Sequence, residues 1–589
     1  MRFLGLSRIA ALFSVSLLAQ PPERRDSVIV TGAYQPIATE ESDRPVRSTP
    51  VRDDLPLAGS AVDFLNRDSS VDLRQRGQNN IQTDLSIRGS TFGQTLVLLD
   101  GMRLNDVQSG HHNLDIPVPL ETLDRIEVLK GAGSTLYGSD AVGGVVHLIT
   151  KPPEHSELRL RGAFGSFGTN QQRVAAAYAR GDFSQQLTAS RDFSTGFIPN
   201  RDYRNLALTS LTRWKRTDIV LATADKPFGA EQFYGNFNSW ERTRTWFASV
   251  RQGIGERTQA GFAFRRHTDL FVLYRDRPQV FTNRHAAESW QANFRRWESL
   301  PANARLHWGV EALGDEIASN NLGHHRRARG SAYAAYDIRA LRRFSLSLGA
   351  REEIYRSFDK QFTPSIAGGA WINEHLKLRA NASRAFRLPT YTDLYYQDPA
   401  NRGTPNLRPE RAWNYEGGLD WHASSRVRGE ITVFQRRERD GIDYVRATPA
   451  DIWRATNFQQ LHFTGLEAGL TLRPREGHIV ELGYTGLHGV QNALSGLQSK
   501  YAFNYPTHQG LVTWRSALPG GLAARARIGA VQRFARDPYA VADLYLARTR
   551  GPVHPFVQVT NLTDRIYEEI FGVRMPGRAA LVGLEWVWR

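Results

Sequence analysis

Polar side chains that could bind a ligand gather in one short stretch of this 589-residue sequence, just after the segment "DGMRLND". The stretch contains Gln108, His111, His112 and Asn113. An imidazole can contact a metal complex or hydrogen-bond a polar ligand near neutral pH. A pair of histidines is also compatible with plain exposure to solvent. We predict that these four residues contact a ligand, and the solvated alternative stays open.

Aromatic residues form a second group. The segment "ADKPFGAEQFYGNFNSWE" (224–241) breaks the alternation of apolar and polar residues around it, which predicts a long surface loop. Aromatic side chains commonly line ligand pockets, so we predict ligand contacts at Phe228, Phe233, Tyr234 and Phe237. Packing within the loop would use the same rings. Another loop is predicted at 320–330, where His324, His325 and Arg326 could meet an anionic ligand or lipid phosphate.

The composition argues against enzymatic chemistry and against nucleic acid. The chain has no cysteine, which excludes disulfides, thiolate metal sites and cysteine nucleophiles. It also lacks a serine nucleophile elbow and a zinc-binding helix motif. We therefore predict no enzyme activity and no resident cofactor or metal, although the ligand could itself be a metal complex. The net charge of +16 comes without zinc-finger spacing, heptads or dense Lys/Arg blocks. Contact with an anionic lipid surface would explain these dispersed arginines. A general compositional bias toward arginine would explain them as well.

The N-terminus predicts export. Arg2 and Arg8 precede or flank an apolar run that ends at Ala19, and this run is too short to span a bilayer. Residues 1–19 therefore resemble a secretory signal peptide. The rest of the chain has no apolar run of about 18 residues, so no transmembrane helix is expected.

Most of the chain alternates with the period of a β-strand. Segments such as "FSLSLGAR" (344–351) and "GLEWVWR" (583–589) place apolar side chains on one face and polar ones on the other. The alternation continues through 154–589 without a helical interruption, which is too many strands for one sandwich. A closed antiparallel barrel leaves no free edge, as lipid requires. We predict an all-β transmembrane barrel at 154–589.

The preceding region, 45–152, differs from the barrel. Its alternation is weak, and "LVLLDG" (96–101) and "GGVVHLIT" (143–150) are apolar on both faces, which indicates buried strands. The segment "LETLDRIEVLKG" (120–131) suggests a helical turn that leads into a strand. This region predicts a small α+β domain.

The motifs of this small domain resemble the plug of TonB-dependent outer-membrane receptors. They are "LSIRGS" (85–90), "TLVLLDGMRLND" (95–106) and "IEVLKGAGSTLYGSDAVGGVVHLIT" (126–150), in the family's order and spacing. The barrel adds "SRAFRLPTYTDLYY" (383–396), and the resemblance covers essentially the whole mature chain. It implies about 22 antiparallel strands with the plug inside the lumen. It also implies a monomer in the outer membrane, surrounded by lipid.

The segment "DSVIVTG" (26–32) then resembles a TonB box. Such a segment is left unpaired so that it can add a strand to the periplasmic domain of TonB. Its β-branched residues favour extended chain. The predicted TonB-binding residues are Asp26, Ser27, Val28, Ile29, Val30, Thr31 and Gly32. A disordered linker with accidental alternation is the alternative.

The resemblance also implies ion pairs between plug and barrel. Arg88 in "IRG" and Lys130 in "LKG" match basic plug positions, and we chose Glu410 and Glu416 as their acidic partners in the barrel. Buried pairs are costly to break singly, so these four residues could act as a latch. Independent surface charges are the alternative. The resemblance places 108–113 near the plug apex.

The function implied is energised uptake of a scarce small-molecule nutrient. Size and layout are similar to the compact vitamin B12 receptors of the family, so cobalamin or a ferric siderophore is expected. A haem receptor stays open, as does a passive porin or adhesin without TonB coupling.

Overall fold

A closed barrel of 22 antiparallel strands dominates the computed structural model, which describes residues 29–30, 37–341, 343–458, 460–490 and 496–589. The first strand, β10 (Glu157–Gly165), pairs with the last, β37 (Ala579–Trp588), so the sheet closes on itself. Closure pairs the backbone polar groups between strands, as a lipid environment requires. The predicted fold class is confirmed. Between β10 and β37 the barrel strands, in order around it, are β11 (Thr169–Arg180), β12 (Phe183–Ser194), β13 (Tyr203–Trp214), β14 (Thr217–Glu231), β15 (Asn238–Ile254), β16 (Thr258–Val272), β17 (Thr282–Leu300), β18 (Ala304–Ser319), β19 (Gly323–Leu341), β20 (Phe344–Tyr355), β21 (Gln361–Asn373), β22 (Leu376–Arg387), β24 (Glu410–His422), β25 (Val427–Arg439), β28 (Leu461–Leu472), β29 (His478–Val490), β31 (Pro506–Leu518), β32 (Leu522–Arg533), β33 (Tyr539–Arg548) and β34 (Val553–Thr560).

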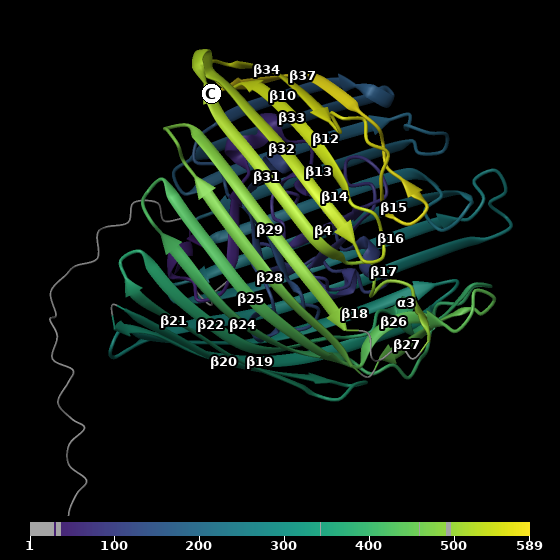
Figure 1. The fold of residues 1–589 in the computed structure, drawn as a ribbon, viewed down its shortest axis with the longest axis horizontal. Coiled ribbons are helices and arrows are strands. Elements are labelled where there is room, and N and C mark those ends of the chain that lie inside the picture. The colour runs from purple at the N-terminus through teal and green to yellow at the C-terminus, as the bar shows by residue number, and fades with distance from the viewer. Residues whose placement is uncertain (1–28, 31–36, 342, 459, 491–495) are drawn as a thin grey trace, which may run out of the picture.

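The two ends of the barrel differ. Short turns join strands at one end, whereas long connections with their own structure cross the other, which we call the long-connection end. Helix α3 (Tyr391–Tyr395), β26 and β27 gather there (Figure 1). In outer-membrane barrels the long connections face outward and the short turns face the periplasm. The small strands of this end are β23 (Asn401–Arg402), β26 (Gly441–Arg446), β27 (Trp453–Phe458), β30 (Gln498–Ser499), β35 (Glu568–Ile570) and β36 (Val573–Arg574).

The predicted alternation runs between the outer surface and the lumen. Phe344 and Leu348 on β20 are 57% and 42% exposed, and Trp586 on β37 is 49% exposed. Glu585, the neighbour of Trp586, is fully buried on the inner side. The outer face is therefore apolar and suited to lipid contact. Among the described residues, no helix has both the length and the apolar character needed to cross a bilayer.

The plug lies within the ring of barrel strands (Figure 1). Its main sheet has the strand order β3-β8-β9-β6-β7, and a hairpin, β4-β5, accompanies it. Leu99, Val128 and Val146 from three of the sheet strands pack in one buried apolar cluster. The plug elements are β3 (Val46–Pro50), α1 (Ala61–Leu65), β4 (Val71–Gln75), β5 (Thr83–Ile87), β6 (Thr95–Leu99), β7 (Met102–Arg103), β8 (Leu123–Lys130), α2 (Ser134–Tyr137) and β9 (Gly144–Thr150).

Barrel arginines hold the plug by its backbone. Arg161 donates to the carbonyl of Leu55 (2.7 Å), and Arg436 donates to those of Arg88 (2.9 Å) and Gly89 (3.0 Å). Hydrogen bonds from charged donors are stronger than neutral ones. Part of the arginine excess therefore faces the lumen and serves plug binding, a use that composition alone did not indicate.

Both predicted loops are shorter than expected, and these predictions were wrong. Within 224–241, β14 continues to Glu231 and β15 begins at Asn238, so the connection is 232–237. Within 320–330, β19 begins at Gly323. The alternation breaks in β14 because its inner face turns apolar, where Phe228 belongs to the same buried cluster as Ile81 of the plug. A mixed inner face, rather than a loop, caused the irregular pattern.

Candidate functional site at the plug–barrel interface

Two plug segments, 76–82 and 105–116, reach the long-connection end, and we call them the plug apex. The amide of Gln82 donates to the hydroxyl of Tyr234 (2.9 Å) near the end of β14. The backbone carbonyls of Val107 and Gln108 accept hydrogen bonds from the first two residues of α3, each at 3.0 Å. The apex is thus hydrogen-bonded to the connections that a ligand arriving from outside would meet.

Three of the four polar residues predicted to bind ligand are buried in this interface. Gln108 donates to Asp269 of β16 (2.7 Å), and the side-chain carbonyl of Asn113 accepts from the backbone of Asp106 (3.0 Å). His112 faces Asp115 and Asp269 at 3.6 and 3.5 Å. The fourth, His111, retains partial exposure at the apex. Ligand contact by these residues stays a prediction, and the geometry supports it for His111.

The pKa values of the two neighbouring histidines shift in opposite directions. Burial lowers the pKa of His111, and the attraction of Asp84, whose carboxylate is 2.6 Å from Nδ1, offsets only part of that shift. Burial would also lower the pKa of His112, but hydrogen bonds to Asp115 and Asp269 raise it well above its usual range. His111 can thus offer a neutral ring to a ligand, whereas His112 is held by two acids.

The predicted aromatic residues divide in the same way. Phe228 and Phe233 lie in a buried cluster, so they stabilise the apex region. Tyr234 is 38% exposed while its hydroxyl also donates to Glu241 (2.7 Å). Phe237 packs edge-on against Tyr274, with ring centroids 5.6 Å apart. Exposure supports ligand contact more strongly at Tyr234 and Phe237 than at the two buried rings.

The residues of the second predicted loop lie on β19 and its turn. The His325 ring stacks on Tyr395 of α3 with centroids 3.7 Å apart, and its Nε2 lies 2.8 Å from the carbonyl of Leu322. His324 and Arg326 are exposed. His325 therefore helps to hold α3 in place.

No pattern in the sequence predicted the aromatic group around His111. His111 stacks on Phe92 (centroids 4.2 Å apart), and both rings meet Tyr501 edge-on, at 5.7 and 5.1 Å. Tyr444 packs edge-on against Tyr501 at 6.3 Å. We call Phe92, His111, Tyr444 and Tyr501 the apex aromatic cluster. Two of its members come from the plug and two from separate connections, so no single stretch of sequence displays it.

The structure brings Arg88 and Glu416 together, as predicted. The guanidinium of Arg88 is 3.0 Å from Glu416, and it also forms two hydrogen bonds with Glu467, at 2.7 and 2.8 Å. Burial alone would lower the pKa of Arg88, but the two carboxylates raise it. Lys130 pairs with Asp68 (3.2 Å) within the plug and lies 3.8 Å from Glu467. Sequence reasoning missed Glu467, which is one of many inward polar residues of the barrel.

Glu410 does not pair with Arg88 or Lys130, so its predicted partners were wrong. It forms a two-point ion pair with Arg387 of the barrel, at 2.6 and 3.1 Å. It still contacts the plug, because Gln94 donates to it at 3.1 Å. The reason is register: Arg387 lies directly opposite Glu410 on the adjacent strand.

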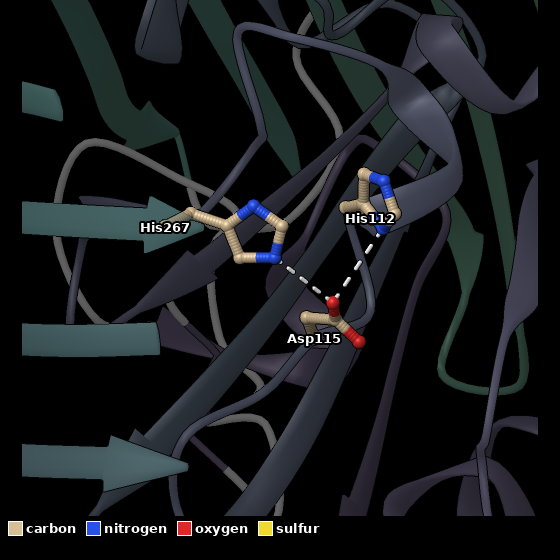
Figure 2. A group of neighbouring side chains, drawn as sticks. All are labelled: His112, Asp115 and His267. Carbon is tan, nitrogen blue, oxygen red and sulfur yellow. Dashed lines mark hydrogen bonds and ion pairs between the residues drawn. The ribbon is translucent and has the colours of Figure 1, made fainter. Parts of the chain in front are cut away.

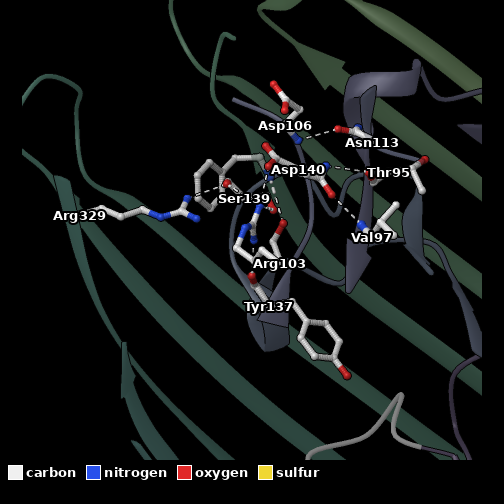
Figure 3. Close-up of polar contacts among 12 residues, drawn as sticks. Thr95, Val97, Arg103, Asp106, Asn113, Tyr137, Ser139, Asp140 and Arg329 are labelled. Carbon is white, nitrogen blue, oxygen red and sulfur yellow. Dashed lines mark hydrogen bonds and ion pairs between the residues drawn. The ribbon is translucent and has the colours of Figure 1, made fainter. Parts of the chain in front are cut away.

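A second polar network fastens the plug to β19. Arg103 donates to the carbonyls of Tyr137 and Ser139 (both 2.8 Å) and pairs with Asp140 (2.5 Å), while Arg329 donates to the Ser139 hydroxyl (2.6 Å) (Figure 3). The adjoining cavity measures about 70 Å³, whereas small-molecule sites usually span roughly 300–1,000 Å³. A nutrient complex cannot pass here unless the plug moves.

The predicted TonB box is described only at Ile29 and Val30. These two residues form β1 (Ile29–Val30), which pairs antiparallel with β2 (Ile37–Ala38). The expectation of an unpaired segment was wrong for them, because β2 pairs with them. Asp26, Ser27, Val28, Thr31 and Gly32 lie outside the described residues, as does the predicted signal peptide 1–19.

Comparison with protein-family models identifies both parts of the molecule. Residues 149–559 match the family described as "TonB dependent receptor-like, beta-barrel". Residues 50–145 match the "TonB-dependent Receptor Plug Domain". The chain belongs to the TonB-dependent receptor family. This receptor is therefore an outer-membrane transporter rather than an enzyme, coupled to TonB and binding a small-molecule ligand.

Both curated relatives and solved structures are similar to this receptor. It is 22% identical over 432 residues to the vitamin B12 transporter BtuB of Vibrio vulnificus, covering 69% of each chain, and 24% identical over 552 residues to the iron-regulated outer membrane virulence protein of Vibrio cholerae, covering 82% and 81%. The ferric enterobactin receptor PfeA of Pseudomonas aeruginosa superposes with a TM-score of 0.76 at 16% identity, over 93% and 99% of the two chains. The siderophore receptor PirA of Acinetobacter baumannii gives 0.75 at 15%, over 92% and 98%. These structural likenesses show the fold alone.

Proposed function

We propose that this receptor takes up a metal-complexed nutrient, cobalamin or a ferric siderophore, across the outer membrane. The observation that carries the proposal is the apex aromatic cluster, which combines plug rings (Phe92, His111) with rings of the outer connections (Tyr444, Tyr501). A ligand that stacks on both parts senses the position of the plug. Ligand binding can then favour one plug state over another, which is the requirement for coupling between the two faces.

Cobalamin is the first candidate because B12 transporters recur among the sequence relatives, for example BtuB of Photobacterium profundum, 24% identical over 443 residues and 70% of each chain. A ferric siderophore is the second candidate. The ammonium of Lys500 lies over the rings of Tyr444 and Tyr501, 5.6 and 5.3 Å from their centroids. A cation beside aromatic rings favours an anionic complex.

The energy would reach the plug through the N-terminal segment. In this proposal, residues 26–32 pair with the periplasmic domain of TonB, and the short pairing of β1 with β2 is exchanged for that strand addition. Force on the segment would then break the latch of Arg88, Lys130, Glu416 and Glu467, while Glu410 holds its own strand pair. In this proposal the receptor acts as a monomer, and outer-membrane lipid contacts its exposed apolar face.

The test is equilibrium binding of cyanocobalamin, and separately of ferric enterobactin, to the full-length receptor in detergent with calcium present. We expect one of the two to bind, and Tyr501→Ala to weaken it at least tenfold. Tyr178→Ala, which removes a 49%-exposed ring of the outer barrel surface, is the matched control and should bind normally. If neither compound binds, the proposed substrate class is wrong.

A further inference from the structure

A cluster of buried acids and histidines joins the plug to β15 and β16, separate from the apex aromatic cluster. His112 and Asp115 belong to the plug, and His267 belongs to β16. His267 Nε2 lies 3.1 Å from Asp115 Oδ2, and His112 Nδ1 lies 3.6 Å from the same oxygen. Figure 2 shows both imidazole rings pointing at this one carboxylate.

The second nitrogen of each ring also faces a carboxylate. His267 Nδ1 is 2.9 Å from Asp106 Oδ2, and His112 Nε2 is 3.5 Å from Asp269 Oδ2. In metal sites the second nitrogen of a ligating histidine commonly faces a carboxylate, which orients the ring. One nitrogen of each ring and one carboxylate oxygen therefore lie close enough together to share a cation once His112 has lost its proton.

Two acids of the cluster have cationic partners. Lys226 neutralises Asp115 by bonding its other oxygen, Oδ1, at 2.7 Å, and Arg265 pairs with Asp106 at 2.8 Å. Asp269 and Glu241 are buried beside His112, and the acids around His112 favour its protonated form. Among the described residues, none hydrogen-bonds to the buried Oδ1 of Asp269. A divalent cation would take the place of the His112 proton beside these buried acids, because metal ligands must be deprotonated.

We propose that His112, Asp115 and His267 bind one divalent transition-metal ion of the Zn²⁺ type. Bonds of about 2.0–2.2 Å in a tetrahedral zinc site place ligand atoms roughly 3.4 Å apart. The observed separations of 3.1 and 3.6 Å bracket that value, and all three ligand atoms lie within 4.8 Å of one another. Imidazole with carboxylate suits zinc, cobalt and nickel. The ion ties the plug to β16, and this role does not depend on which nutrient is transported.

The experiment uses the full-length receptor in detergent, stripped with a chelator and titrated with Zn²⁺ by calorimetry, with bound metal measured after desalting. The wild type should hold one equivalent more zinc than His112→Gln or His267→Gln. His111→Gln is the matched control, because the adjacent ring faces Asp84 instead. Zinc should also raise the resistance of the plug to urea in the wild type and the control, but not in the two variants.

Cobalt provides a test that does not depend on any variant. Wild-type receptor loaded with one equivalent of Co²⁺ should show the strong visible bands of a tetrahedral site. Weak octahedral bands alone would overturn the proposal, and so would a His112→Gln/His267→Gln double variant that retains the wild-type zinc stoichiometry. In either case, the cluster would be a hydrogen-bonded network only.

Discussion

Replacing Arg88 by methionine should release the plug more than any exposed ion-pair change. Arg88 is 2% exposed, and its guanidinium joins Glu416 and Glu467 and lies over the Phe434 ring, 4.3 Å from its centroid. Methionine fills much of the space but leaves two buried carboxylates without their shared cation. Lys130, 3.8 Å from Glu467, compensates for only one of them.

The size of the expected loss of plug stability follows from the burial of Arg88. Removing one partner of a buried ion pair costs about 3–5 kcal/mol, because the remaining charge stays desolvated. Since each 1.4 kcal/mol or so is a factor of ten in an equilibrium constant, the population with a displaced plug should rise by about two to four orders of magnitude. Glu416→Gln should cost less, since Arg88 keeps both of its hydrogen bonds to Glu467.

The chain has no cysteine, so one introduced cysteine can be labelled uniquely. We would attach a fluorophore at Gln78→Cys on the plug apex and measure the free energy of plug unfolding in urea. The matched control is Arg213→Met, which breaks a two-point pair with Asp218 (2.6 and 2.8 Å) at a 43%-exposed position of the barrel. An exposed pair is worth about 0–1 kcal/mol.

The reasoning is refuted if Arg88→Met, with its barrel intact, lowers the free energy of plug unfolding by no more than the control does. A double-mutant cycle with Glu467→Gln gives the decisive number, because only a true pair produces a coupling energy. A coupling near zero would mean that Arg88 and Glu467 are independent charges.

Three further predictions follow. Burial disfavours the Asp68 carboxylate, but Lys130 and Arg47 more than offset this and lower its pKa to about 2. The stabilising effect of Asp68 should therefore be complete above the unfolded-state pKa near 4 and should disappear as pH falls toward 2. Asp68→Asn should then reduce the acid dependence of plug unfolding by about 2 kcal/mol. Identical urea curves at pH 2.5 and 6 in the wild type would contradict this. Gly131 has φ +78°, and a Cβ there would collide with the Glu416 carboxylate. Gly131→Ala should therefore lower the free energy of plug unfolding by at least about 1–2 kcal/mol in the same urea assay. A stability equal to that of the wild type would argue against this close approach. Val28→Pro should abolish uptake by cells but leave ligand binding in detergent unchanged, because proline cannot donate in an added strand; normal uptake would exclude this segment as the TonB contact.

Local periodicity was sufficient to predict a β-barrel, whereas the number of strands and the plug inside the lumen came from the family resemblance. Alternation at 344–351 and 583–589 has one physical cause, lipid on one side of the sheet and lumen on the other, and each strand records it independently. The plug motifs are likewise local turns and buried strands. The barrel, the plug and the family could therefore be predicted from residues close together in the sequence.

Apart from Arg88 and Glu416, the charges that meet could not be predicted in this way. Arg88 pairs with Glu467, 379 positions away, and Glu410 with Arg387, because barrel register sets which inward side chains oppose each other. The burial of Gln108 and His112 and the apex aromatic cluster also depend on how the plug sits in the lumen. The sequence determines which faces are polar, whereas only the closed barrel around its plug decides which polar groups become partners and which remain exposed to a ligand.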